Sequence, residues 1–135
     1  MNGYKSVMAQ FVLTHSVSEP KVLFSAKDAK WPIAFQGKNN YVTDGPFIIK
    51  QKDCLEMIWS SYSKTGYAIG VCRSKSIKGP RIQEDQPIYS DDGGHAMVFE
   101  KDGQKIITFH APNTFDGNER LVLYPYHSKI ENSQN

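Results

Sequence analysis

The sequence is poor in cysteine, has no marked excess of either charge and contains no long apolar run. Two cysteines, Cys54 and Cys72, are too few for a disulfide framework and lack the spacing of a metal knuckle. Sixteen basic residues against fourteen acidic ones, without a block of five like charges, argue against nucleic acid as a partner. No apolar run approaches the roughly 18 residues of a membrane span, and Met1–Leu13 lacks the order of a signal peptide, so no membrane partner is expected and the compartment stays open.

The composition predicts one folded domain, and the pattern predicts that it is all-β. Of the 135 residues, 39% are hydrophobic and 12% aromatic, which is too many for a disordered chain. Short apolar runs alternate with turn residues, and no stretch of ten has a helical period. We predict a domain over residues 1–127 and a polar tail over 128–135. The predicted strands are Ser6–Leu13, Lys21–Ser25, Pro46–Lys50, Cys54–Tyr62, Tyr67–Arg73, Gln86–Tyr89, His95–Glu100, Lys105–His110 and Arg120–Tyr126.

Turn chemistry predicts local register. If Ser63–Gly66 is a hairpin turn, Tyr62 faces Tyr67 and Cys72 faces Met57, which places Cys72 and Cys54 on opposite faces of the sheet. Two free thiols are therefore expected. Ser25–Lys30 is long enough for one helical turn. The strand pattern suits a sandwich, a barrel or propeller blades and does not choose among them.

Two polar clusters at strand entrances are candidates for chemistry. Asp44 precedes a rigid Gly-Pro step, so it is either a fixed carboxylate at a strand entrance or a residue that caps a turn. Asp91–His95 combines two carboxylates, two glycines and an imidazole. It suits metal chemistry, an acid/base site or a glycine-rich turn, and a single histidine is weak evidence for zinc.

A hairpin centred on Asp102-Gly103 predicts that His95 faces His110. Two histidines at the open end of one hairpin mark a common pole of the fold, or else a cross-strand polar pair at a sheet edge. Aromatic residues supply a third ingredient. Trp31 and Trp59 are either core residues or, if exposed near a carboxylate, platforms for the C–H face of a sugar.

Taken in order, these clusters resemble one enzyme family, glycoside hydrolase family 43. The family comprises β-xylosidases, α-L-arabinofuranosidases, arabinanases and their relatives. The match runs from about Asp28 to Tyr126 and corresponds to the second half of the family domain. It rests on Thr43–Phe47, Met57–Ser61, Gly66–Gly70, Gly79-Pro80, Asp92–Met97, His110–Asn113 and Glu119-Arg120.

The resemblance implies a five-bladed β-propeller of antiparallel strands, of which this chain would hold two to three blades. It implies an inverting acid/base mechanism on xylan-type or arabinan-type saccharides. Asp44 corresponds to the general acid, usually a glutamate, whereas the general base and a second aspartate are expected upstream of this chain. His95 corresponds to a histidine near an axial ion, often calcium, held largely through water. Trp31, Trp59 and His110 are the expected substrate-binding residues.

Two hypotheses follow. The first is a glycosidase-like chain that is incomplete by itself and takes a carbohydrate substrate. The second is a non-catalytic carbohydrate-binding or assembly module that self-associates through exposed strand edges, because an incomplete propeller leaves strand edges unpaired. Whether the chain alone is an enzyme is left open by the sequence.

Overall fold

The computed structural model describes residues 5–8, 11–12, 15–16, 18–37, 39–114 and 116–127. Within these ranges the chain consists of antiparallel strands and two short 3₁₀ helices, which confirms the all-β prediction. The elements are β1 (Lys5–Met8), β2 (Phe11–Val12), β3 (His15–Ser16), β4 (Lys21–Ser25), η1 (Ala26–Asp28), η2 (Phe35–Gly37), β5 (Asp44–Lys50), β6 (Leu55–Ser63), β7 (Gly66–Ser74), β8 (Ile82–Gln83), β9 (Gly94–Lys101), β10 (Gln104–Ala111) and β11 (Arg120–Pro125).

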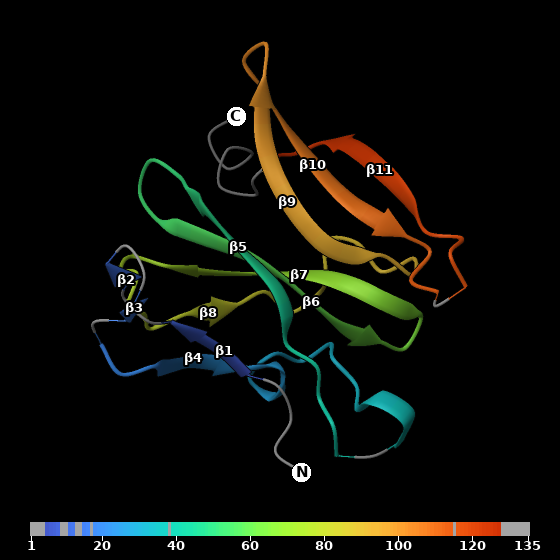
Figure 1. Ribbon diagram of the computed structural model, residues 1–135, viewed down its shortest axis with the longest axis horizontal. Helices are drawn as coiled ribbons and strands as arrows, with labels where there is room; N and C mark the ends of the chain where they lie inside the picture. The colour runs from blue at the N-terminus through green and yellow to red at the C-terminus, as the bar shows by residue number, and fades with distance from the viewer. Residues whose placement is uncertain are drawn as a thin grey trace.

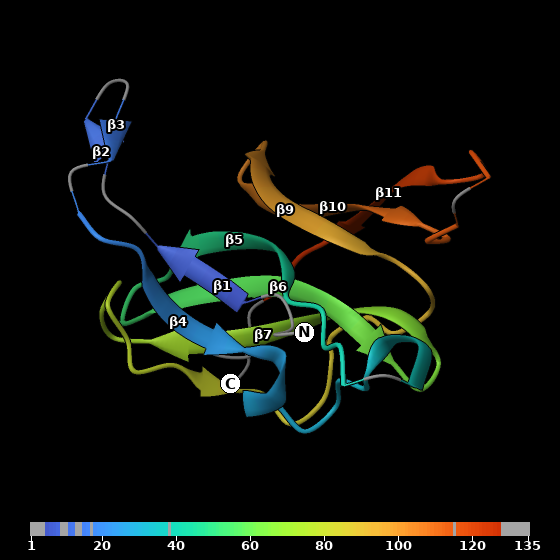
Figure 2. The ribbon, with the colours of Figure 1, turned by 60° about the horizontal axis from the view of Figure 1, so that its bottom comes forward.

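Three sheets follow one another through the molecule. The four-stranded sheet β5-β6-β7-β8 lies in the middle of Figure 1, with the three-stranded sheet β11-β10-β9 above it and the β1-β4 pair below it. The small β2-β3 ribbon stands apart from these sheets in Figure 2. Among the described residues, no helix is long and apolar enough to cross a membrane.

The central sheet is buried on both faces, and its inner strands β6 and β7 carry apolar residues on both of them. One face contributes Ile58, Ile69 and Val71 to a core shared with the three-stranded sheet, and the other contributes Met57, Trp59, Ala68 and Cys72 to a core shared with β4 and η1. A strand covered on both sides loses the alternation of apolar and polar residues. This burial fixes β6 and β7 between two layers and thereby fixes the strand ends that form the site.

Most predicted elements are confirmed, several within one or two residues at their ends. Lys21–Ser25 is β4, and Ser25 is also the N-cap of η1, where its hydroxyl accepts a hydrogen bond from the Lys27 N–H as part of a capping box. Ser6–Leu13 overlaps two strands, β1 and β2, with residues 9, 10 and 13 outside the described part. The polar tail 128–135 also lies outside it.

One predicted strand is wrong. Gln86–Tyr89 forms only an isolated bridge between Tyr89 and Ile69, whereas Ile82–Gln83 pairs with β7 as the fourth strand. Pro87 explains the difference, because proline has no N–H for a strand ladder.

The β6–β7 register agrees with the prediction. Tyr62 pairs with Tyr67 and Met57 with Cys72, and both cysteines are free. Burial raises the pKa of the Cys72 thiol to about 12, so this thiol is protonated at neutral pH. It is a core residue and not a nucleophile.

The β9–β10 register is as predicted only up to Thr108, which pairs with Met97. Beyond it the register shifts, and His110 pairs with Gly94 instead of His95. His95 has a φ of 56°, and its N–H donates to the Ser60 hydroxyl at 3.0 Å. The extra residue is a β-bulge, which re-aims the His95 side chain and corrects the predicted His95–His110 pairing.

Candidate functional site

Five strand ends meet at one pole of the molecule. β5 and β9 begin there, near Asp44 and His95, and the β6–β7 hairpin turns there between Tyr62 and Tyr67. β10 ends there at Ala111. The common pole predicted from the Asp102-Gly103 hairpin is therefore present. It holds a depression of about 380 Å³, which is lined by Phe35, Asn40, Val42, Asp44, Tyr62, Tyr67, His95 and Asn113.

Asp44 is fixed at this pole by its backbone and by its neighbours. Its Oδ1 accepts from the Gly45 N–H at 2.9 Å, and its Oδ2 accepts from the Tyr67 hydroxyl at 2.8 Å. His95 Nδ1 lies 3.4 Å from the same Oδ2. Gly45 has a φ of 52°, and a Cβ there would lie 3.1 Å from the His95 Cα, so glycine permits this close approach. The Asp44 side chain is 42% exposed and remains open to a ligand.

The Tyr67 hydroxyl, which donates to Asp44, stays protonated because of its surroundings. Its residue is buried, and Gly94 makes room for the ring, because a Cβ at Gly94 would lie 2.3 Å from Tyr67 Cε1. Burial first, and then the hydrogen bond to Asp44, raise the pKa of Tyr67 well above its usual value. The phenol therefore keeps its proton at neutral pH and directs it at the carboxylate.

An aromatic wall borders Asp44. Phe35 stacks on Tyr62 with ring centroids 4.4 Å apart, and Tyr62 lies 5.0 Å from Tyr67. The Phe35 loop is held by two backbone bonds, from Ile33 N–H to Tyr62 O and from Phe35 N–H to Asn40 O, each 2.9 Å long. The sequence did not single out Phe35 as a site residue. The sequence shows that Phe35 is aromatic, but its contact with Tyr62 depends on the path of this loop.

His110 lies at the pole, as predicted, and its ring is held by Asn113. His110 Nε2 lies 2.8 Å from Asn113 Oδ1, and Asn113 Nδ2 donates to the Tyr62 hydroxyl at 3.3 Å. The His95 and His110 rings are 6.0 Å apart despite the shifted register. The structure thus brings Asp44, His95 and His110 together.

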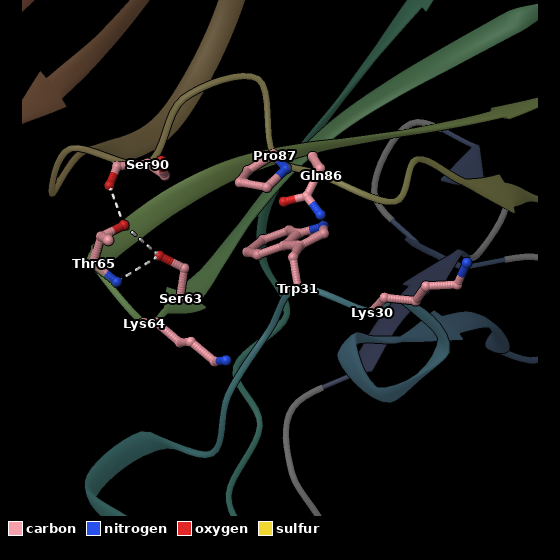
Figure 3. Close-up of a pocket in the computed structure, with 8 residues that line it drawn as sticks. All are labelled: Lys30, Trp31, Ser63, Lys64, Thr65, Gln86, Pro87 and Ser90. Atoms are coloured by element: carbon pink, nitrogen blue, oxygen red, sulfur yellow. Dashed lines mark hydrogen bonds between the residues drawn. The ribbon is translucent and has the colours of Figure 1, made fainter.

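The two tryptophans lie elsewhere. Trp59 is fully buried, and its Nε1 donates to Gln83 Oε1 at 3.2 Å. Trp31 is 8% exposed and packs on Trp59 at 4.9 Å and across Gly70. The platform prediction is wrong for Trp59, because a sugar needs an open ring face. Trp31 only borders a second depression of about 300 Å³, where its ring lies below Gln86 and Pro87 (Figure 3).

Among known proteins, the chain is similar to solved structures. Neither a family model nor a curated protein matches the chain. Among solved structures, the endo-arabinase from Bacteroides thetaiotaomicron VPI-5482 is 42% identical, with a TM-score of 0.78 over 87% of this chain and 43% of that one. The chain is a relative of glycoside hydrolase family 43.

Two further solved structures, each 21% identical to this chain, share its fold. A thermostable family-43 glycoside hydrolase has a TM-score of 0.66 over 85% of this chain and 41% of its own. The Cellvibrio cellulosa α-L-arabinanase, solved with arabinohexaose, has a TM-score of 0.51 over 66% of this chain and 35% of its own. The chain therefore spans less than half the length of the structures it matches.

The calcium ion expected from family 43 stays a prediction. Calcium takes six to eight oxygen ligands, and His95 offers a nitrogen. Among the described residues, no three histidine, cysteine, aspartate or glutamate side chains converge as a metal site. These residues do not fit a directly ligated ion, so no step proposed below passes through one.

Proposed function

We propose that the chain is the part of an arabinan-hydrolysing glycosidase that carries the general acid. The proposal rests on one observation: Asp44, a half-exposed carboxylate, lies in a depression beside stacked aromatic rings in a chain 42% identical to an endo-arabinase. Aromatic faces pack against the C–H faces of sugars, and a carboxyl group beside them is placed to protonate a glycosidic oxygen. Xylan-type saccharides are the second substrate class.

Inverting hydrolysis needs a second carboxylate about 6.5–9.5 Å from the acid, on the other side of the bond, to activate water. We infer that this base and the second aspartate come from chain segments corresponding to the rest of the matched structures, of which this chain spans 43% in the endo-arabinase. The three sheets would then be blades of a five-bladed propeller. His95 and His110 line the same pole and would contact substrate hydroxyls.

The acid role is tested by Asp44→Asn with Asp53→Asn as the control, because Asp53 is exposed and follows the other end of β5. Both variants are assayed together with the segments that supply the proposed general base, on linear arabino-oligosaccharides and on an aryl arabinoside. A general acid matters most when the leaving group is poor. Asp44→Asn should abolish cleavage of the oligosaccharide and reduce that of the aryl glycoside less. Unchanged oligosaccharide cleavage would exclude Asp44 as the acid.

A second function, a binding or assembly module, is favoured by one surface. Leu121 and Leu123 on the edge strand β11 are 74% and 53% exposed, and the run Leu121–Tyr124 carries no charge that would discourage edge pairing. We propose self-association through this edge. Light scattering should show a mass that depends on concentration and that Leu123→Lys lowers, whereas Ile82→Lys on the β8 edge leaves it unchanged. Binding of arabino-oligosaccharide, measured by calorimetry, without turnover even when the segments carrying the proposed base are supplied, would favour the module over the enzyme.

A further inference from the structure

Asp92 bridges two strand ends of the candidate site. Its Oδ1 accepts from the Tyr67 N–H and its Oδ2 from the Asn113 N–H, both at 3.1 Å. These partners lie 25 and 21 positions away along the sequence. An aspartate that only caps its own turn bonds to residues two or three positions away. Asp92 instead joins the start of β7 to the segment after β10.

The surrounding glycines leave room for this bridge. A Cβ at Gly66 would lie 3.0 Å from the Asp92 Cβ, and one at Gly93 would lie 2.7 Å from the His110 carbonyl oxygen. The Gly93 N–H donates to the Tyr67 carbonyl at 2.9 Å, beside the bond that Asp92 accepts from the Tyr67 N–H. Asp92 itself has a φ of 53°, which aspartate tolerates better than most residues. Tyr67 is thus held at both backbone polar groups by neighbouring residues.

Each partner of Asp92 holds a different part of the pocket. Tyr67 donates its hydroxyl to Asp44. Asn113 contacts His110 Nε2 through Oδ1 and the Tyr62 hydroxyl through Nδ2. One carboxylate therefore supports the proposed acid on one side and the aromatic wall with His110 on the other.

We propose that Asp92 is the positioning residue of this site: its two backbone hydrogen bonds fix Tyr67 against Asp44 and Asn113 against His110 and Tyr62. The inference rests on the proposed function only for what the pocket binds. Asp92 is not among the residues that line the depression, so it acts through its two partners.

The arrangement predicts a signature on His110. Asn113 presents Oδ1 to His110 Nε2 and Nδ2 to the Tyr62 hydroxyl, and because an amide oxygen only accepts, this orientation predicts that Nε2 carries the hydrogen. Neutral His110 is therefore held in the Nε2–H tautomer. Loss of the Asp92 bond frees the Asn113 backbone, and the tautomer preference should relax toward that of a free imidazole.

The experiment uses the full chain with Asp92→Asn, Asp92→Ala and the control Asp91→Asn, an exposed neighbour of the same charge. Asparagine keeps one acceptor oxygen, so one of the two bonds is lost, whereas alanine loses both. Nitrogen-15 NMR at a pH where His110 is neutral measures its tautomer. Calorimetry measures the affinity for linear arabino-oligosaccharide, and circular dichroism checks the fold.

Asp91→Asn should behave as wild type. Asp92→Asn should disturb the His110 tautomer and weaken saccharide binding about tenfold, and Asp92→Ala should do more, because backbone hydrogen bonds to a carboxylate are among the stronger ones. Unchanged His110 signals in folded Asp92 variants would overturn the proposal. So would unfolding of both Asp92 variants while Asp91→Asn folds, since Asp92 would then determine the fold. If wild type binds no saccharide, the proposed function fails, and the NMR comparison still decides the role of Asp92.

Discussion

The central strands have a buried carboxylate near one end and an exposed carboxylate near the other. At the end opposite the site, Glu56 is completely buried, and its Oε2 forms an ion pair with Arg73 at 2.7 Å. Its Oε1 accepts from the Tyr126 hydroxyl and from Gln51 Nε2. At the site end, Asp44 also accepts from a tyrosine hydroxyl, but its side chain is 42% exposed beside a depression. Each carboxylate accepts a hydrogen bond from a tyrosine, but only Asp44 is accessible to solvent or to a ligand.

This difference separates a structural carboxylate from a candidate functional one. The charge of Glu56 is countered inside the protein by Arg73, and its hydrogen bond with Tyr126 ties the residue that follows β11 to the start of β6. A buried carboxylate without a partner would be costly, so such a group is kept paired. Asp44 keeps an exposed surface for a ligand. The comparison predicts that stability depends on the Glu56 end and that binding depends on the Asp44 end.

Glu56→Gln should have the largest effect on stability. It removes the negative charge from beside Arg73, whose side chain is 16% exposed. Arg73 keeps a second carboxylate partner, Glu84, so the loss should be about 1–3 kcal/mol, the cost of depriving buried donors of their charged acceptor. Urea unfolding should show this loss relative to wild type, with exposed Glu100→Gln near wild type as control. A loss below about 1 kcal/mol would mean that Glu56 is not the structural member of the comparison.

Tyr67→Phe should have an intermediate effect that grows weaker at high pH. Loss of the hydroxyl removes one hydrogen bond, worth about 1 kcal/mol at neutral pH. In the wild type, the raised pKa of Tyr67 means that the folded state holds its proton after the unfolded state, with a pKa of about 10, has lost it. The contribution of the Tyr67 hydroxyl to wild-type stability is therefore fully present below about pH 10 and is lost as the pH rises further.

The measurement is urea unfolding at intervals from pH 8 to 11. Tyr67→Phe should show a shallower alkaline decline than wild type, although Tyr89, whose pKa is also raised by burial, still contributes to it. Tyr124→Phe, an exposed residue, serves as control and should keep the wild-type slope. Equal slopes in wild type and Tyr67→Phe would show that the Tyr67 hydroxyl is not held as the structure has it.

The sequence predicted the pole and three of its residues for definite reasons. Turn chemistry at Asp102-Gly103 and at Ser63–Gly66 placed the hairpin ends, because the register of a short hairpin follows from its turn. Asp44 was found from its position before a Gly-Pro step. What failed was the last pair of the hairpin, where the bulge at His95 depends on a contact with Ser60 from another sheet. Such a contact between sheets has no signal within the hairpin.

The aromatic residues show the same limit. Trp59 lies in a strand buried on both faces, and the apolar run Met57–Trp59 that ends on it was a signal for core that the platform prediction underweighted. Phe35 meets Tyr62 only because the loop after Trp31 folds back onto the β6–β7 hairpin. A loop of this kind contains residues with positive φ, here Gln36 and Gly37, and its path does not follow from strand periodicity.

The smallest effect should come from Lys30→Gln, which tests burial alone. The Lys30–Asp85 pair has the same 2.7 Å N–O distance as Arg73–Glu56, but its side chains are 75% and 66% exposed. Water and salt screen an exposed pair, and ordering two long side chains offsets most of the attraction, so the loss should stay below about 1 kcal/mol. Urea unfolding at low and high salt measures it, and any small effect should vanish at high salt. A loss as large as that of Glu56→Gln would mean that distance, and not burial, separates structural from surface charges in this protein.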